Sequence, residues 1–219
     1  MLVDSVKFFC YHNEKNLGSL MHYNQTKFLK SAQKLSQIPS ESKIEIAFAG
    51  RSNAGKSSAI NKITNISGLA KTSKTPGRTQ LLNYFQVSED RFLVDLPGYG
   101  YAKVAHTVQK EWEKTLTAYI ETRQQLRGIV LIMDIRHPLT QHDQNMLAWV
   151  TNHNIPVHIL LSKADKLNRG PAMSTLLAVR KALLPYADLV TVQLFSALKG
   201  TGVDDARYKL DAWFASDSV

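Results

Sequence analysis

Residues 50–57 read Gly50-Arg51-Ser52-Asn53-Ala54-Gly55-Lys56-Ser57, after an apolar run at 44–49 that predicts a buried strand and before a helix expected at 56–66. A G-x-x-x-x-G-K-S turn between strand and helix points backbone N–H groups inward around an anion, and the helix adds the positive end of its dipole. The two glycines let the backbone approach that anion closely. Lys56 can then reach the β- and γ-phosphates, and the Ser57 hydroxyl can hold Mg²⁺. The stretch predicts a site for a nucleoside triphosphate.

A second motif, Ser162-Lys163-Ala164-Asp165, predicts which base this site accepts, and it follows an apolar strand expected at 157–162. Guanine presents two donors, at N1 and at the 2-amino group, and the single carboxylate of Asp165 can accept both. Adenine lacks both donors and would leave the carboxylate unpaired, which a buried polar site rejects strongly. The aliphatic stem of Lys163 would lie over the base and shape its pocket. The motif therefore favours guanine nucleotides.

Two further motifs end strands that are expected downstream of the turn. The strand at 91–95 runs into Asp95-Leu96-Pro97-Gly98, where Asp95 is expected to hold Mg²⁺ through water and the Gly98 N–H to sense the γ-phosphate. The strand at 189–195 ends in Phe195-Ser196-Ala197-Leu198-Lys199, a loop expected to pack near the guanine. Because an open parallel sheet binds its ligand at the carboxyl ends of its strands, the four motifs together predict one GTP site.

The chain resembles the EngB family of small bacterial GTPases, in the TrmE–Era–EngA–EngB group of the translation-factor class. T-P-G-R-T-Q at 75–80 and D-L-P-G-Y-G-Y at 95–101 carry this resemblance, because the other motifs occur across GTPases. It extends from Phe28 to the C-terminus and implies a GTPase acting in assembly of the 50S ribosomal subunit, with a role in cell division and septation. That cellular role does not follow from spacing or composition.

The polar segment at 67–79 joins the first helix to the next strand, and in GTPases this segment is switch I, which γ-phosphate and Mg²⁺ order. The resemblance places the Mg²⁺-binding threonine at Thr79, while the residues alone leave Thr72 and Thr75 open as rivals. A solvated loop without a ligand role is the alternative for the segment as a whole. Switch II is expected to begin at Asp95 and to run through residue 105. The nucleotide-contacting positions of switch I that the resemblance implies are Gly77, Arg78, Thr79, Gln80 and Leu81.

The position just after the D-x-x-G motif predicts slow catalysis, because this chain has Tyr99 where Ras-like enzymes carry a water-orienting glutamine. A phenol is not an equivalent positioning group, and the sequence reveals no arginine finger in cis, so slow intrinsic hydrolysis is expected. The charge of Lys56 on the phosphates is then one expected catalytic contribution. Asn53 is another, since in relatives an Asn at this position helps to coordinate a K⁺ ion that bridges the phosphates. Stabilisation of the turn by side-chain-to-backbone hydrogen bonds is the alternative for Asn53, and both stay open.

The fold class predicted is α/β: a Ras-like P-loop GTPase fold with a six-stranded, mostly parallel sheet and helices on both faces. The strands at 81–87 and 91–95 are joined too closely for a crossover and must be antiparallel, which predicts one antiparallel edge strand. The other strands alternate with helices and so predict parallel βαβ units. The remaining expected strand lies at 128–134, and the helices are expected near 56–66, 109–126, 141–153, 171–184 and 202–214.

The formal net charge of +9 suggests a polyanionic partner. With the resemblance, the predicted partners besides GTP and GDP are the rRNA and proteins of the large ribosomal subunit. Scattered solvated lysines are the alternative, and so is a signalling or cell-division GTPase that acts on a protein without RNA contact. The candidate basic residues are Lys27, Lys30, Lys34, Lys43, Lys71, Lys74, Arg78, Lys110, Lys114, Arg123 and Arg127.

The single cysteine, Cys10, fits a reducing compartment, and residues 2–10 are too short and too polar for a signal peptide or a membrane span. A cytoplasmic protein without membrane contact is therefore expected, and separately we expect a monomer. Residues 28–219 are predicted to form a single G domain, preceded by a flexible extension at 1–27. The first twenty residues have no counterpart in the family pattern, whose usual start resembles Met21 onward, so an extension and a start at Met21 both stay open.

Overall fold

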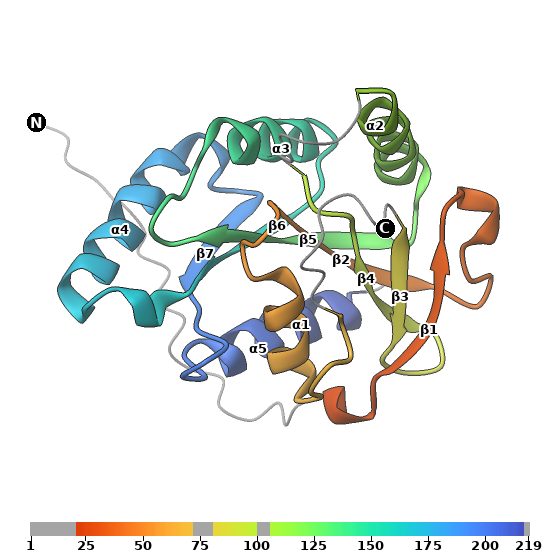
Figure 1. The fold of residues 1–219 in the computed structure, drawn as a ribbon, viewed down its shortest axis with the longest axis horizontal. Coiled ribbons are helices and arrows are strands. Elements are labelled where there is room, and N and C mark those ends of the chain that lie inside the picture. Colours follow the sequence, from red (N-terminus) through yellow and green to blue (C-terminus); the bar gives the residue numbers. More distant parts are fainter. Residues whose placement is uncertain (1–20, 72–80, 100–105, 217–219) are drawn as a thin grey trace, which may run out of the picture.

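The computed structural model describes residues 21–71, 81–99 and 106–216, with the side chains of residues 106–113 left out (Figure 1). The strands are β1 (Lys27–Ala32), β2 (Ile44–Gly50), β3 (Leu82–Gln86), β4 (Arg91–Asp95), β5 (Leu126–Asp134), β6 (Val157–Ser162) and β7 (Val190–Leu194). The α-helices are α1 (Lys56–Thr64), α2 (His106–Thr122), α3 (Gln141–Asn152), α4 (Arg169–Ala182) and α5 (Val203–Ala215). Short 3₁₀ turns are η1 (Tyr23–Gln25), η2 (Leu35–Gln37), η3 (Ala164–Lys166) and η4 (Leu184–Tyr186).

Among the described residues, seven strands form one sheet in the order β1-β3-β4-β2-β5-β6-β7. Strands β4, β2, β5, β6 and β7 are parallel to one another, whereas β3 is antiparallel to both β1 and β4. The predicted α/β fold with a mostly parallel sheet is confirmed. The predicted strand count of six is wrong, because β1 was missed. The antiparallel strand is therefore not at the edge: β3 lies inside the sheet, and β1 covers it.

The two faces of the sheet bury separate hydrophobic cores. On one face, α2, α3 and α4 pack through apolar side chains such as Tyr119, Leu147 and Leu176. On the other, α1 and α5 pack through residues such as Ile60 and Phe214. The central strand β2 lies between the two cores and is buried along almost its whole length, as expected of a parallel strand covered on both sides. The prediction of helices on both faces is confirmed.

Residues ahead of β1 also take part in the packing. Tyr23 is buried, and its hydroxyl donates a hydrogen bond to Asp211 of α5 at 2.7 Å. The hydroxyl of Thr26, also buried, donates to the carbonyl of Tyr23 at 2.7 Å. Tyr23 and Thr26, ahead of the predicted boundary at residue 28, are therefore buried against the rest of the described chain.

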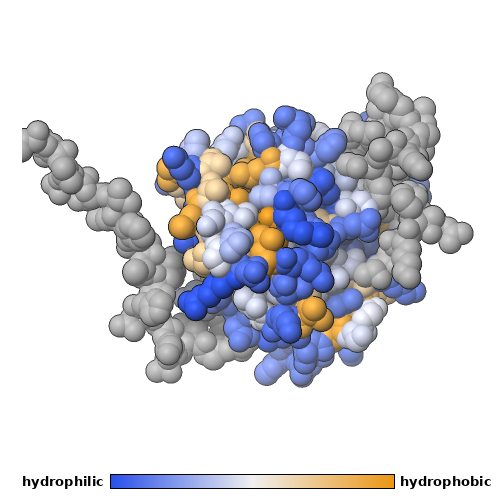
Figure 2. Space-filling view, turned by 60° about the vertical axis from the view of Figure 1, so that its left-hand side comes forward, coloured by the Kyte–Doolittle hydropathy of each residue, from blue (hydrophilic) through white to orange (hydrophobic). Residues whose placement is uncertain are grey.

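The outer surface is mostly hydrophilic on the side that carries α4, which Figure 2 turns toward the viewer. Hydrophobic patches interrupt it, and the exposed large apolar side chains of α4 are Met173 and Leu177. Single exposed apolar residues are ordinary on protein surfaces. In the part of the chain that the structure describes, no helix is both long and apolar enough to cross a bilayer.

Candidate nucleotide-binding site

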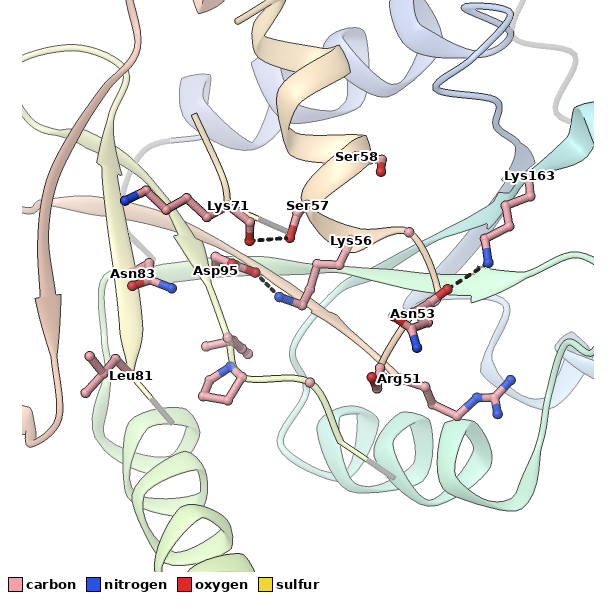
Figure 3. A pocket seen from close by; sticks show the side chains of 15 residues that line it. Arg51, Asn53, Lys56, Ser57, Ser58, Lys71, Leu81, Asn83, Asp95 and Lys163 are labelled. Carbon is pink, nitrogen blue, oxygen red and sulfur yellow. Dashed lines mark hydrogen bonds and ion pairs between the residues drawn. The ribbon is translucent and has the colours of Figure 1, made fainter. Parts of the chain in front are cut away.

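A cavity of about 380 Å³ opens where β2 and β4 end and α1 begins (Figure 3). Its wall brings together three predicted elements that are far apart in the sequence: the turn at 50–57, the D-x-x-G segment and the lysine after β6. This is the edge of the sheet at which open α/β folds bind ligands. The predicted site residues that line it are Arg51, Ser52, Asn53, Gly55, Lys56, Ser57, Leu81, Asp95, Leu96, Pro97, Gly98 and Lys163.

Two glycines shape the turn that forms the floor of this cavity. Gly55 precedes α1 with φ of +102°, a conformation that residues with a Cβ rarely adopt. At Gly50, a Cβ would lie 2.8 Å from the carbonyl oxygen of Ile132, so only glycine allows β2 and β5 to approach this closely. The turn thus delivers Lys56 and Ser57 as the first residues of α1, with the helix N-terminus facing the cavity.

Lys56 and Asp95 form an ion pair across the cavity, and both side chains are almost fully buried (Figure 3). The Ser57 hydroxyl, one residue further along α1, donates to the carbonyl of Lys71 at 3.3 Å. A hydroxyl and a carboxylate facing one anion-binding turn are oxygen ligands of the kind that Mg²⁺ takes alongside substrate phosphates. Ser57 and Asp95 therefore fit the metal that the motifs imply.

The other predicted guanine-specificity residues follow Lys163, which lines the cavity. Ser196, itself fully buried, donates its hydroxyl hydrogen bond to Asp165 at 2.6 Å. The backbone N–H of Ala164 donates to the carbonyl of Phe195 at 3.0 Å, so the two loops are joined by main chain as well. Ala197 follows, half-buried. The structure therefore brings the loops after β6 and β7 together, as the motifs predicted.

Asp134, at the carboxyl end of β5, was not identified from the sequence. Its carboxylate accepts hydrogen bonds from Lys163 at 2.9 Å and from the Arg136 guanidinium at 2.6 and 3.0 Å. The hydrogen bonds from Arg136, aided by Lys163, hold the pKa of Asp134 far below its usual range, although burial opposes this. Lys163 also donates to the carbonyl of Asn53 at 2.7 Å. Asp134 thus positions the lysine that joins the loop after β6 to the turn at 50–57. An aspartate at the end of an apolar strand was the available signal.

Tyr99 is bonded to α3 and is not among the described residues that line the cavity. Its ring is buried, and its hydroxyl donates to Asp143 at 2.9 Å. Burial, followed by the charge of Asp143, raises the pKa of Tyr99 well above its usual value, so the phenol stays neutral. The structure thus gives this side chain a packing and hydrogen-bonding role in place of the water-orienting role of a glutamine.

Asn53 adopts φ of +60° in the turn and is exposed at the cavity. In Figure 3 its side chain lies close to Arg51. Its side-chain amide makes no hydrogen bond to another described residue, which favours contact with a ligand over stabilisation of the turn. Of the switch I predictions, Leu81 lies in the cavity wall. The predicted residues Gly77, Arg78, Thr79 and Gln80 lie outside the described residues, as do Thr72 and Thr75.

Comparisons with known proteins agree with this geometry. A family model described as "50S ribosome-binding GTPase" matches residues 45–163. A protein of Aliivibrio fischeri (strain MJ11) named "Probable GTP-binding protein EngB" is 53% identical over 199 residues, which cover 91% of this chain and 93% of that protein. The protein of the same name in Coxiella burnetii (strain RSA 331 / Henzerling II) is 51% identical over 195 residues, covering 89% and 95%.

Solved structures show the same fold. A crystal structure of a probable GTP-binding protein engB gives a TM-score of 0.63 at 21% identity, and the match covers 77% of this chain and 97% of that chain. Era in complex with MgGDPNP and nucleotides 1506–1542 of 16S ribosomal RNA gives a TM-score of 0.59 at 21% identity, over 78% of this chain and 57% of that chain.

Proposed function

The chain belongs to the EngB family of GTP-binding proteins and is a GTPase, and from this we propose that it acts as a nucleotide switch in assembly of the large (50S) ribosomal subunit. The observation that carries the proposal is the match of residues 45–163 to a family described as ribosome-binding. In the same proposal, the protein is a monomer with one G domain that works in the cytoplasm, and normal cell division and septation depend on it.

We assign the nucleotide contacts by position in the cavity. The backbone of the turn and Lys56 hold the β- and γ-phosphates, and Asp165 accepts from the guanine. Mg²⁺ is held by Ser57 and Thr79 and, through water, by Asp95. The Lys56–Asp95 pair supports this assignment, because the two groups that would face phosphate and metal already face one another. Binding would exchange one ion pair for two charge-matched contacts.

Hydrolysis by the isolated protein is slow in this proposal, because Tyr99 bonds Asp143 and supplies no water-orienting group. Asn53 is assigned the K⁺ site. Its amide is exposed at the cavity, and Lys163 holds the backbone carbonyl of the same residue, which supports the assignment. A K⁺ ion there would add positive charge at the phosphates, where the transition state gains negative charge.

The distribution of exposed lysines supports a ribosomal-RNA contact. Lys27 and Lys30 on β1, and Lys34 beside η2, are exposed. The turn η2 packs against α2, the helix that follows the D-x-x-G segment, and Lys114 of α2 is exposed too. These four lysines, here called the β1–α2 basic side, thus lie next to an element expected to respond to nucleotide. Phosphate contacts by lysine are salt-dependent and do not require base readout.

Sedimentation with ribosomal subunits tests the function. The purified protein is mixed with 50S and 30S subunits in the presence of GDP or a non-hydrolysable GTP analogue, and bound protein is measured at increasing salt. We expect binding to 50S that is stronger with the GTP analogue and weakens as salt rises. Equal binding in both nucleotide states would refute the switch. Subunit binding that does not change with salt would favour a contact with protein over RNA, as in the alternative of a cell-division GTPase that acts on a protein.

A further inference from the structure

The segment that ends the D-x-x-G motif is held against the phosphate-binding turn by main-chain hydrogen bonds. The N–H of Tyr99 donates to the carbonyl of Gly50 at 3.4 Å, and the N–H of Ser52 donates to the carbonyl of Tyr99 at 3.1 Å. In this arrangement Gly98, the residue before Tyr99, forms part of the cavity wall. The backbone position of Tyr99 therefore fixes where the Gly98 N–H lies.

The side chain of Tyr99 ends on a fully buried carboxylate. Asp143 accepts the Tyr99 hydroxyl on one oxygen, at 2.9 Å. Its other oxygen accepts the backbone N–H of Thr140 at 3.0 Å and the Thr140 hydroxyl at 2.7 Å, so it also caps the start of α3. Arg51, from the phosphate-binding turn, places its Nε 3.5 Å from the same oxygen. One carboxylate thus contacts the turn, the D-x-x-G segment and α3.

The turn that Asp143 caps contains a strained residue. Leu139 has φ of +53°, which is rare for a bulky side chain and costs conformational energy that the surrounding contacts must offset. Gln144 donates to the carbonyl of Leu139 at 2.7 Å, and Arg51 reaches the carbonyl of His137 at 3.4 Å. The turn before α3 is therefore kept in a costly conformation by contacts that include a residue of the phosphate-binding turn.

We propose that Tyr99 is a positioning residue for the γ-phosphate contact, and that the Tyr99–Asp143 pair couples this contact to the turn before α3. The bond to Asp143 keeps Gly98 in the cavity wall, where its N–H can meet the γ-phosphate. The same bond transmits a shift of Gly98 to the strained turn. The proposal rests on the assignment of Gly98 to the γ-phosphate but not on any ribosomal partner.

The test compares Tyr99→Phe with Tyr119→Phe. The Tyr119 hydroxyl also donates to a buried carboxylate, Glu45 at 2.7 Å, but at the opposite end of β2, so it is a matched control. Affinities for fluorescent GDP and for a fluorescent non-hydrolysable GTP analogue are measured for each variant. We expect Tyr99→Phe to weaken the GTP analogue by about threefold to tenfold, in line with the loss of one hydrogen bond, with GDP unchanged. Tyr119→Phe should leave the ratio of the two affinities as in the wild type.

Hydrogen–deuterium exchange supplies a second readout. In the wild type, residues 136–145 should exchange more slowly with the GTP analogue than with GDP, and this difference should vanish in Tyr99→Phe and persist in Tyr119→Phe. Because Asp143→Asn also alters the contacts of Asp143 with Thr140 and Arg51, the test is the coupling between the two positions. Tyr99→Phe should weaken the GTP analogue less in the Asp143→Asn background than in the wild type. Equal weakening of both nucleotides, an unchanged affinity ratio, or the same exchange difference in Tyr99→Phe would overturn the proposal. Failure of the ribosome sedimentation alone would not affect it.

Discussion

The carboxylate of Asp165, which we propose binds the base, is held in place by its neighbours. Ser196 donates to one of its oxygens at 2.6 Å, and the Lys166 ammonium lies 3.8 Å from the other. The aspartate side chain is only 7% exposed, so its oxygens have few water partners to fall back on. Two donors on a guanine edge match this carboxylate, and a mismatched ligand would leave a desolvated charge unpaired.

Asp165→Asn should change the base that the site selects. The amide replaces one acceptor with a donor, which would face the N1 or 2-amino donors of guanine. We expect GTP affinity to fall by at least about a hundredfold and xanthosine triphosphate to gain relative to it. A competition titration measures both, with exposed Asp188→Asn as the control of equal charge change. An unchanged preference for GTP would remove Asp165 from the base site.

Asn53→Ala tests the K⁺ assignment. If the amide coordinates K⁺ at the phosphates, replacing Na⁺ with K⁺ should raise the GTP hydrolysis rate of the wild type, and the variant should lose this difference. A tenfold stimulation would correspond to about 1.4 kcal/mol of barrier. Single-turnover hydrolysis at constant ionic strength checks it, with GDP affinity as the control for folding. A stimulation by K⁺ that survives in Asn53→Ala would assign the ion to other residues.

At the scale of elements, periodicity predicted the buried strands and all five helices but not β1. The β1 residues at 27–30 are exposed, two of them are lysines, and the register shifts between Phe28 and Lys30. An edge strand of this kind forms because β3 offers it a partner, and no apolar pattern in its own sequence reveals that. Helix ends differed by up to four residues, because caps and tertiary contacts set them.

In the candidate site too, the sequence predicted the residues that lie in local motifs and missed those that act through distant partners. Local motifs predicted the turn, Asp95 and Lys163, because each carries its chemistry within a few residues. Asp134 and Asp143 were missed, since each matters through partners distant in sequence: Asp134 through Lys163, and Asp143 through Tyr99 and Arg51. For Tyr99 the sequence excluded a glutamine-like role but could not reveal what the phenol contacts.

The buried imidazole of His158, on β6 and bonded to β7, is expected to make the stability of the fold depend on pH. Gln193 donates its amide to the carbonyl of Gly202, so its oxygen accepts from His158 Nε2 at 2.8 Å, and Nδ1 accepts from Thr191 at 2.7 Å. Burial, partly opposed by the Gln193 bond, lowers the pKa of His158 from 6.5 to about 4. The folded state therefore holds this imidazole neutral between those two values, where the unfolded chain protonates it.

Stability should consequently fall on acidification. The contribution of His158 is complete above pH 6.5 and is lost progressively as the pH drops toward 4, because the unfolded state then binds more protons. Between pH 7.5 and pH 5 we expect a loss of about 2 kcal/mol from this residue. Urea unfolding of the wild type and of His158→Gln at both pH values measures it. The same pH dependence in both proteins would assign the loss to other groups.

At the scale of the whole molecule, not every basic residue behind the net charge of +9 is free to contact RNA. Arg123, one of the candidate contact residues, pairs at 2.5 Å with Glu45, which is fully buried at the start of β2. This pair fixes the C-terminal end of α2 to the sheet and takes Arg123 out of the set that could meet RNA. Arg127 is half-buried and donates to the carbonyl of Gln124. The exposed lysines of the β1–α2 basic side are left as the stronger candidates.

Charge neutralisation at the two edges of the sheet can separate a specific RNA contact from general attraction. Lys27→Gln with Lys30→Gln removes two charges from β1, and Arg180→Gln with Lys181→Gln removes two exposed charges from α4, which packs on β7 at the opposite edge (Figure 1). If the β1–α2 basic side contacts rRNA phosphates, the first pair should weaken 50S binding. It should also make the dependence of log K on log salt shallower by about 0.7 to 0.9 for each phosphate that a lysine no longer neutralises.

The second pair should leave both quantities near the wild-type values, and nucleotide affinity should be unchanged in all variants. Equal weakening by the two pairs would mean that net charge alone attracts the subunit, since only a located contact distinguishes one edge of the sheet from the other.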